Sequence, residues 1–158
     1  AYPRSGSESS TGLDVVIGNP GVYVRSDPHG RGAGVVTADD AFNYQFAPYA
    51  SSGVPIEVLT FRRGGFANVT RQYPDLVRRD AAQWWKSFSA DPSDGLGTLA
   101  AWMADQCLLG KGRSGWATID QLLAGGKLAG FPNGGTWPLG TDYVAQLHVF
   151  LRQHGYCR

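Results

Sequence analysis

Glu57 is the acidic residue of this sequence that is best placed to act as a catalytic acid. It lies in the middle of VPIEVLTF, residues 54–61, and the only other glutamate is Glu8. Apolar neighbours raise the pKa of a carboxyl group, and a general acid needs such a rise to work near neutral pH. A glycosidase needs two carboxyl groups, one on each side of the glycosidic bond. We therefore take Glu57 as the first candidate for such an acid; the alternative is a solvent-exposed glutamate paired with Arg62 or Arg63.

Asp39 and Asp40 are the candidates for the second carboxylate. They stand beside Asn43 and Tyr44, and a single turn of the chain would bring them into the same cleft as Glu57. Aspartate is also a favoured residue at a helix N-terminus, where its side chain accepts hydrogen bonds from free backbone N–H groups. Capping of a short helix is thus the competing interpretation of this pair.

The three histidines predict no metal site. His29 follows Asp27 in a glycine-rich loop that is typical of a solvated turn, although an Asp–His pair can also orient an imidazole for base catalysis. His148 falls within a predicted helix, and His154 falls at its end, where the helix dipole favours it. A ribonuclease that uses Glu57 as base, a histidine as acid and an arginine on the phosphate is a third functional alternative.

Aromatic residues in loops predict a carbohydrate-binding surface. The sequence has 5 Trp, 7 Tyr and 7 Phe, and part of this set lies outside regular helical patterns. Flat aromatic rings stack against the C–H faces of sugars, although loop aromatics also cover a protein core. The predicted substrate-binding residues are Tyr44, Tyr49, Trp116, Asn133 and Trp137.

The charge, the apolar runs and the motifs of the sequence exclude several classes of protein. Fourteen Lys and Arg residues against 13 Asp and Glu give a net charge of +1, without the basic excess of a nucleic-acid binder. No apolar run approaches the roughly 20 residues that cross a bilayer. The motifs of zinc peptidases, α/β-hydrolases, P-loop enzymes and Rossmann folds are also missing, so no cofactor is predicted.

Two cysteines, Cys107 and Cys157, predict one disulfide bond. No CxxC motif competes for them as a zinc site, and a bridge would attach the end of the chain to the body of the protein. A disulfide, together with a polar start at Ala1 that has no methionine, is expected of a mature secreted protein. Asn68-Val69-Thr70 is a glycosylation sequon, which has meaning only in a eukaryotic secreted protein.

The order of predicted elements defines the fold class. Short β-branched runs and one longer strand occupy the first third, at residues 15–17, 22–24, 35–36 and 54–61. Thr37, Asp39 and Asp40 resemble a helix start, and residues 62–70 are expected to form a turn or loop. The apolar periodicity then predicts helices from Pro74 to about residue 90, from about Thr98 to 108, over 116–124 and over 141–154.

Strands followed by helices, without alternation, predict an α+β fold with a small β-rich N-terminal lobe and a mainly helical body. This layout is similar to that of lysozyme by analogy alone. We expect a loose arm over residues 1–12 and a single domain over 13–158. The predicted function is a secreted, monomeric hydrolase that acts on a polysaccharide or another neutral polar ligand. The alternative is a secreted module that binds a glycan or a protein without catalysis.

Overall fold

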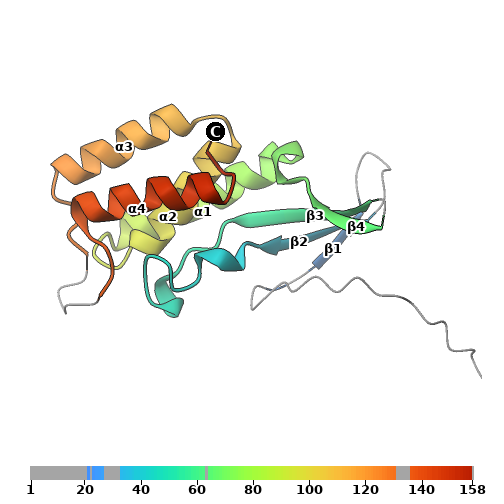
Figure 1. The fold of residues 1–158 in the computed structure, drawn as a ribbon, viewed down its shortest axis with the longest axis horizontal. Coiled ribbons are helices and arrows are strands. Elements are labelled where there is room, and N and C mark those ends of the chain that lie inside the picture. Colours follow the sequence, from blue (N-terminus) through green and yellow to red (C-terminus); the bar gives the residue numbers. More distant parts are fainter. Residues whose placement is uncertain (1–20, 22, 27–32, 63, 131–135, 158) are drawn as a thin grey trace, which may run out of the picture.

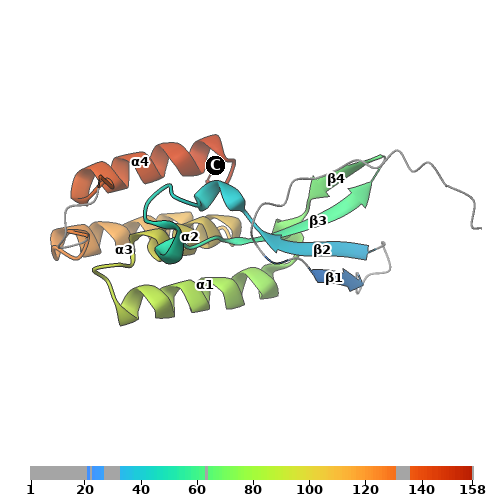
Figure 2. The ribbon, with the colours of Figure 1, turned by 90° about the horizontal axis from the view of Figure 1, so that it is seen from below.

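A computed structural model of the chain describes residues 21, 23–26, 33–62, 64–130 and 136–157. A four-stranded sheet forms one end of the molecule, and four helices gather at the other end (Figures 1 and 2). The described strands all precede the four α-helices in the sequence. The α+β prediction, with a small N-terminal β lobe and a helical body, is therefore confirmed.

The described elements follow one another in a simple order. The strands are β1 (Tyr23–Ser26), β2 (Ala33–Ala38), β3 (Ile56–Arg62) and β4 (Gly65–Asn68). Three short 3-10 helices are η1 (Asp40–Phe42), η2 (Tyr49–Ser51) and η3 (Thr70–Gln72). The α-helices are α1 (Pro74–Ala90), α2 (Leu96–Leu108), α3 (Gly112–Ala124) and α4 (Gly140–Gln153).

The sheet is antiparallel, with the strands in sequence order β1-β2-β3-β4. Val58 of β3 lies opposite Val36 of β2, and with Val69 these side chains form a small apolar cluster. Partly buried Leu76, from the first turns of α1, packs against that cluster. One face of β3 therefore holds the sheet to α1, which leaves the opposite face for Glu57.

The fourth strand differs from the sequence prediction of a loop over residues 62–70. Gly64 has a φ of 82°, which suits a tight turn, and β4 runs back along β3 from Gly65. Phe61 and Phe66 lie opposite each other, with ring centroids 5.4 Å apart. Cross-strand aromatic pairs of this kind stabilise antiparallel strands. The sequence did not predict this strand because it has only four residues and begins with a glycine.

Helix α1 begins at Pro74 as predicted, but α2 and α3 begin earlier than the sequence indicates. Thr98 is not the N-cap of α2, because the helix already begins at Leu96 and the Thr98 hydroxyl donates back to the Gly95 carbonyl. Helix α3 begins at Gly112 rather than at residue 116. Thr37 belongs to β2, and the helix start predicted near it is the single 3-10 turn η1.

Helix α2 lies in the middle of the helical group in both views (Figures 1 and 2). Its buried residues Leu99, Met103 and Ala104 belong to a core cluster that also includes side chains of η1, α1, α3 and α4. Trp102 is buried in this cluster, and Trp84 and Trp85 are partly buried against it, so these three tryptophans pack in the core.

The loop that leads into β3 packs closely on the start of α2. A Cβ atom on Gly53 would lie 2.7 Å from the Thr98 Cα, and one on Gly97 would collide with the Ser51 carbonyl oxygen. Only glycine permits this approach of two backbones. Because β3 begins three residues after Gly53, this contact fixes where the strand that carries Glu57 starts.

Several sequence predictions concern residues that lie outside the described ranges. These are the arm over residues 1–12, the strand at 15–17, His29 and Asn133. Within the described ranges, no helix combines the length and the apolar character that crossing a bilayer requires.

Candidate active site

A pocket of about 460 Å³ lies where the sheet meets the C-terminal segment. Glu57 comes from β3, and Asp39 comes from the residue that follows β2. The other polar residues of the wall are Asn68, Arg71, Gln72, His154 and Tyr156. Thus the structure brings Asp39 and Glu57, two of the three predicted catalytic residues, into one pocket.

Glu57 is half-buried and has one polar partner among the described side chains. Its register partner in β2 is Thr37, and the Asn68 amide Nδ2 donates a hydrogen bond of 2.8 Å to Glu57 Oε1. Burial raises the pKa of Glu57, and the negative charge of Asp39 raises it further, while the bond from Asn68 partly opposes both effects. The side chains of Arg62 and residue 63 lie outside the described part, so the ion pair considered in the sequence is not tested.

Asp39 uses both carboxylate oxygens to bind the protein. Oδ1 accepts from the backbone N–H of Ala41 at 3.0 Å, so Asp39 caps the short helix η1. Oδ2 accepts from the Tyr156 hydroxyl at 2.8 Å. Capping and a place in the pocket are therefore compatible roles for this residue. A carboxylate has about four acceptor sites, so two remain for a ligand.

Asp40 lies outside the pocket wall and is exposed. Its carboxylate accepts a hydrogen bond from the Asn43 side chain. Two aspartates that are adjacent in sequence therefore occupy different settings, with Asp39 in the pocket and Asp40 on the surface of η1.

Tyr156 connects the pocket to the core. Its ring is 7% exposed and packs edge-on against Phe42, with ring centroids 5.4 Å apart. Burial and the neighbouring negative charge of Asp39 raise the pKa of Tyr156 far above its usual value. The hydroxyl therefore stays protonated and remains a donor to Asp39.

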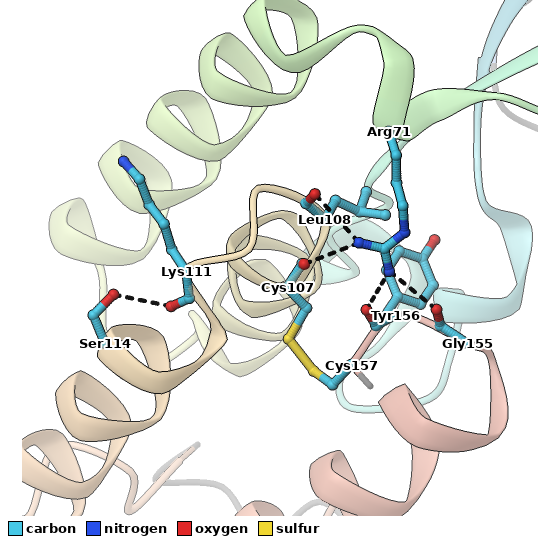
Figure 3. Close-up of a disulfide and its surroundings, with 8 residues drawn as sticks. All are labelled: Arg71, Cys107, Leu108, Lys111, Ser114, Gly155, Tyr156 and Cys157. Atoms are coloured by element: carbon cyan, nitrogen blue, oxygen red, sulfur yellow. Dashed lines mark hydrogen bonds between the residues drawn. A yellow bond between two sulfur atoms is a disulfide. The ribbon is translucent and has the colours of Figure 1, made fainter.

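Arg71 and the disulfide hold the Tyr156 segment in place (Figure 3). The Arg71 guanidinium donates to the carbonyls of Cys107 and Leu108 at the end of α2 and to those of Gly155 and Tyr156. Free carbonyls at helix ends attract cations, and a planar guanidinium can reach several of them at once. The predicted Cys107–Cys157 bond is present, with Cα atoms 5.0 Å apart, and crosslinks the same two segments.

His154 also lines the pocket, although the sequence analysis assigned it only a place at the end of a helix. It is the C-cap of α4, and its ring lies 4.2 Å from that of Phe150, centroid to centroid. An exposed imidazole in this position can donate or accept a proton.

A second pair of carboxyl groups lies behind the strand. Asp80 of α1 accepts hydrogen bonds from the Ile56 backbone N–H at 2.7 Å and from Trp84 Nε1 at 2.9 Å. Asp105 of α2 is fully buried, and burial together with the charge of Asp80 raises its pKa to about 10. Asp105 therefore remains a neutral acid at pH 7, while Asp80 anchors the first residue of β3, directly before Glu57.

The predicted sugar-binding aromatics do not line the acidic pocket. Tyr44 and Tyr49 are exposed and pair with each other, with ring centroids 5.6 Å apart. Trp116 lines a second pocket beside the disulfide, and Trp137 is half-buried and borders neither pocket. As substrate-binding residues, all four remain predictions.

Asn68, Arg71 and Tyr156 belong to the pocket wall, although no pattern in the sequence predicted them as site residues. Asn68 stood out only as a sequon, yet its amide uses Nδ2 on Glu57 and Oδ1 on the Thr70 backbone and hydroxyl. A glycan on Nδ2 would displace Glu57. The signal for Tyr156 was its position next to Cys157, because a disulfide fixes its neighbours as well as its own cysteines.

One protein-family model matches the helical part of the chain. The model of the sll0997 C-terminal domain matches residues 77–155, which run from the first turn of α1 to the residue before Tyr156 and make up half of the chain. Asp39 and Glu57 precede the matched region, and His154 lies within it. Searches of curated proteins and of solved structures found no match. The chain therefore belongs to the sll0997 C-terminal domain family.

Proposed function

We propose that this protein is an extracellular hydrolase that cleaves a glycosidic bond in a polymeric glycan. Glu57 is the general acid, and Asp39 is the second carboxylate. The observation that carries this proposal is that both groups line one pocket and that burial raises the pKa of Glu57. A carboxyl group with a raised pKa next to an anchored carboxylate is the equipment that this reaction requires.

The chemistry assigns a separate task to each carboxyl group. Glu57 transfers its proton to the glycosidic oxygen as the bond from that oxygen to the anomeric carbon breaks. Asp39, held by Ala41 and Tyr156, stabilises positive charge on the sugar and supplies the free lone pairs that bind water or attack the anomeric carbon. One water molecule is consumed in total, and its addition to the anomeric carbon completes the hydrolysis.

Two further features support the extracellular setting and the glycan. A disulfide bond persists in oxidising compartments, and this chain has one between two segments that shape the pocket. The exposed Tyr44–Tyr49 pair offers flat rings on the same lobe as Asp39. These rings would bind the glycan at a distance from the cleaved bond.

The decisive experiment measures hydrolysis of chitin, peptidoglycan and mannan by wild-type protein and by Glu57→Gln. We expect the variant to lose at least about 100-fold in turnover, because general acid catalysis contributes a factor of this size. Asp142→Asn, in the exposed first turn of α4, is the matched control and should retain activity. Turnover of Glu57→Gln at the wild-type rate would exclude the assignment, and glycan binding without any product would favour a binding module.

The pH profile gives a second test of the same acid. Asn68 lowers the pKa of Glu57 through its hydrogen bond, so Asn68→Ala should move the alkaline limb of kcat/KM to higher pH. A limb that does not move, in an active variant, would show that another group donates the proton.

RNA hydrolysis is a second candidate, because His154 lines the same pocket as Glu57. In that reaction, Glu57 would be the base and His154 the acid. The phosphate would need a cation other than Arg71, whose guanidinium is bound to backbone carbonyls. Degradation of RNA that is lost in His154→Ala would favour this candidate over the glycosidase.

A further inference from the structure

A second pocket of about 370 Å³ adjoins the acidic one. Arg71 and Tyr156 line both pockets, so the two hollows lie on either side of these residues. Both volumes fall in the range of roughly 300–1,000 Å³ that is usual for small-molecule sites. The two pockets are therefore suited to neighbouring units of one chain-like ligand.

The two pockets differ in charge. Asp39 and Glu57 line the first, whereas no described residue of the second wall is acidic, and Arg113 supplies a cation. Arg113 is exposed, and it makes no hydrogen bond or ion pair with any residue in the described ranges. An arginine without a partner among the described residues keeps its two-pronged donor geometry for a carboxylate of a ligand.

Trp116 provides an apolar surface next to Arg113. The two residues are three positions apart in α3, which places them on the same side of the helix. The indole ring is stacked on His148 at a centroid distance of 3.5 Å and an angle of 11°. Burial lowers the pKa of His148, which favours the neutral imidazole, and the stacking contact restricts rotation of the Trp116 ring.

We propose that the second pocket binds a sugar unit that carries a carboxylate, with Arg113 pairing with the carboxylate and Trp116 packing on the sugar ring. This inference rests on the proposed function, because the acidic pocket would hold the neighbouring unit whose bond is cleaved. The net charge of +1 led us to expect a neutral or weakly charged ligand, but the two acids line only the first pocket and Arg113 lines only the second. A glycan in which acidic units alternate with neutral ones matches that segregation.

Calorimetry with paired oligosaccharides tests this inference without relying on turnover. The probes are trigalacturonic acid and the disaccharide of N-acetylglucosamine and N-acetylmuramic acid, each compared with its methyl ester. Titrations use the Glu57→Gln protein, so that no probe is hydrolysed. We expect at least one acid to bind about tenfold or more tightly than its ester, as a hydrogen bond to a charged group predicts. The acid that binds identifies the source of the carboxylate.

Substitution of the arginine then assigns the contact. Arg113→Gln should weaken the acid to the affinity of its ester, while Arg79→Gln, an exposed arginine of α1 outside both pockets, should change neither. Trp116→Ala should weaken the acid and the ester alike. The proposal would be overturned if the protein with Arg113 intact bound acid and ester equally. It would also be overturned if Arg113→Gln left the affinity for the acid unchanged.

The two proposals fail in distinguishable ways. Arg113-dependent binding in a protein that hydrolyses no glycan would refute the catalytic function and leave the acidic-sugar site in place. Hydrolysis that depends on Glu57 but is equal for acidic and esterified glycans would support the catalytic function and refute the acidic-sugar site.

Discussion

Two pairs of carboxyl groups lie on opposite sides of β3, and each pair includes a group whose pKa is raised. Asp39 and Glu57 border an open pocket and face polar groups such as Asn68 and His154. Asp80 and Asp105 lie between α1 and α2, and Asp105 has no exposed surface. Burial is the largest cause of the raised pKa of both Glu57 and Asp105.

The two pairs differ in whether a substrate can reach them. A raised pKa alone would mark Asp105, at about 10, as the more perturbed group, yet no substrate can reach a side chain that is fully buried. The pKa of Glu57 is shifted less, but its side chain borders a pocket that a substrate can enter. Structural groups can thus show larger pKa shifts than the groups at an accessible site, so geometry must select between them.

The largest expected effect concerns the disulfide, which fixes the residue next to Tyr156, the hydrogen-bond donor to Asp39. Replacing Cys107 and Cys157 by serine should lower the free energy of unfolding by about 4 kcal/mol, since the bond closes a loop of 50 residues. Urea denaturation would measure this loss. At low urea, the pKa of Glu57 should return toward its usual value, because loss of the bond opens the pocket that Glu57 and Tyr156 line together. The pKa of Asp105 should stay high, because burial and the charge of Asp80 raise it. Carboxyl NMR titration would check both, and equal changes in the two would contradict the comparison.

The next effect compares two neighbouring aspartates. Asp39→Asn should reduce kcat/KM by about 100-fold, as expected when one of a pair of acid and base groups is removed. Asp40→Asn should stay within about twofold of wild type, because Asp40 lies outside the pocket. Steady-state kinetics on the same glycan measures both variants. Equal losses would mean that the wrong aspartate has been assigned.

The buried pair should be visible in the pH dependence of stability. Because the pKa of Asp105 is about 10 in the folded protein and lower in the unfolded chain, the folded state binds the extra proton. Stability from this group is therefore full at low pH and falls as pH rises toward 10, with a slope of at most about 1.4 kcal/mol per pH unit. Asp105→Asn should flatten this dependence in urea denaturation between pH 5 and 9. An unchanged slope in a folded variant would contradict a neutral Asp105.

The smallest effect concerns a single hydroxyl group. Tyr156→Phe removes the donor to Asp39 and should cost about 1 kcal/mol of stability and a few-fold in kcat. Tyr143→Phe is the matched control, since its buried hydroxyl donates to the Leu96 carbonyl, away from the pocket. It should show a similar loss of stability with full activity. If both variants lose activity equally, Tyr156 has no special role at the site.

Much of the fold follows from local patterns in the sequence. The apolar periodicity of Leu76, Val77, Ala81 and Phe88 predicted α1, and the alternation around Val58 predicted β3. These signals are strong because one face of each element is buried. By contrast, β4 has four residues and begins with glycine, and its stability comes from pairing with β3 rather than from its own composition.

The site was only partly predictable for a different reason. Glu57 and Asp39 stood out because acids are scarce near apolar strands. Asn68, Arg71 and Tyr156 become site residues only through contacts with distant segments, such as the bonds from Arg71 to the carbonyls of residues 107 and 156. No local pattern encodes such contacts. Trp116 was expected among the loop aromatics, but it lies within α3, and its pocket lies next to the acidic one rather than within it.

The hydrogen bond from Tyr156 to Asp39 spans 117 residues, nearly the whole described chain. During synthesis, Asp39 leaves the ribosome long before its tyrosine donor does. The pocket wall therefore cannot be complete until Tyr156 has been made. A truncation just before Tyr156 would spare every described strand and α-helix, yet it would remove the donor to Asp39 and one side of the pocket.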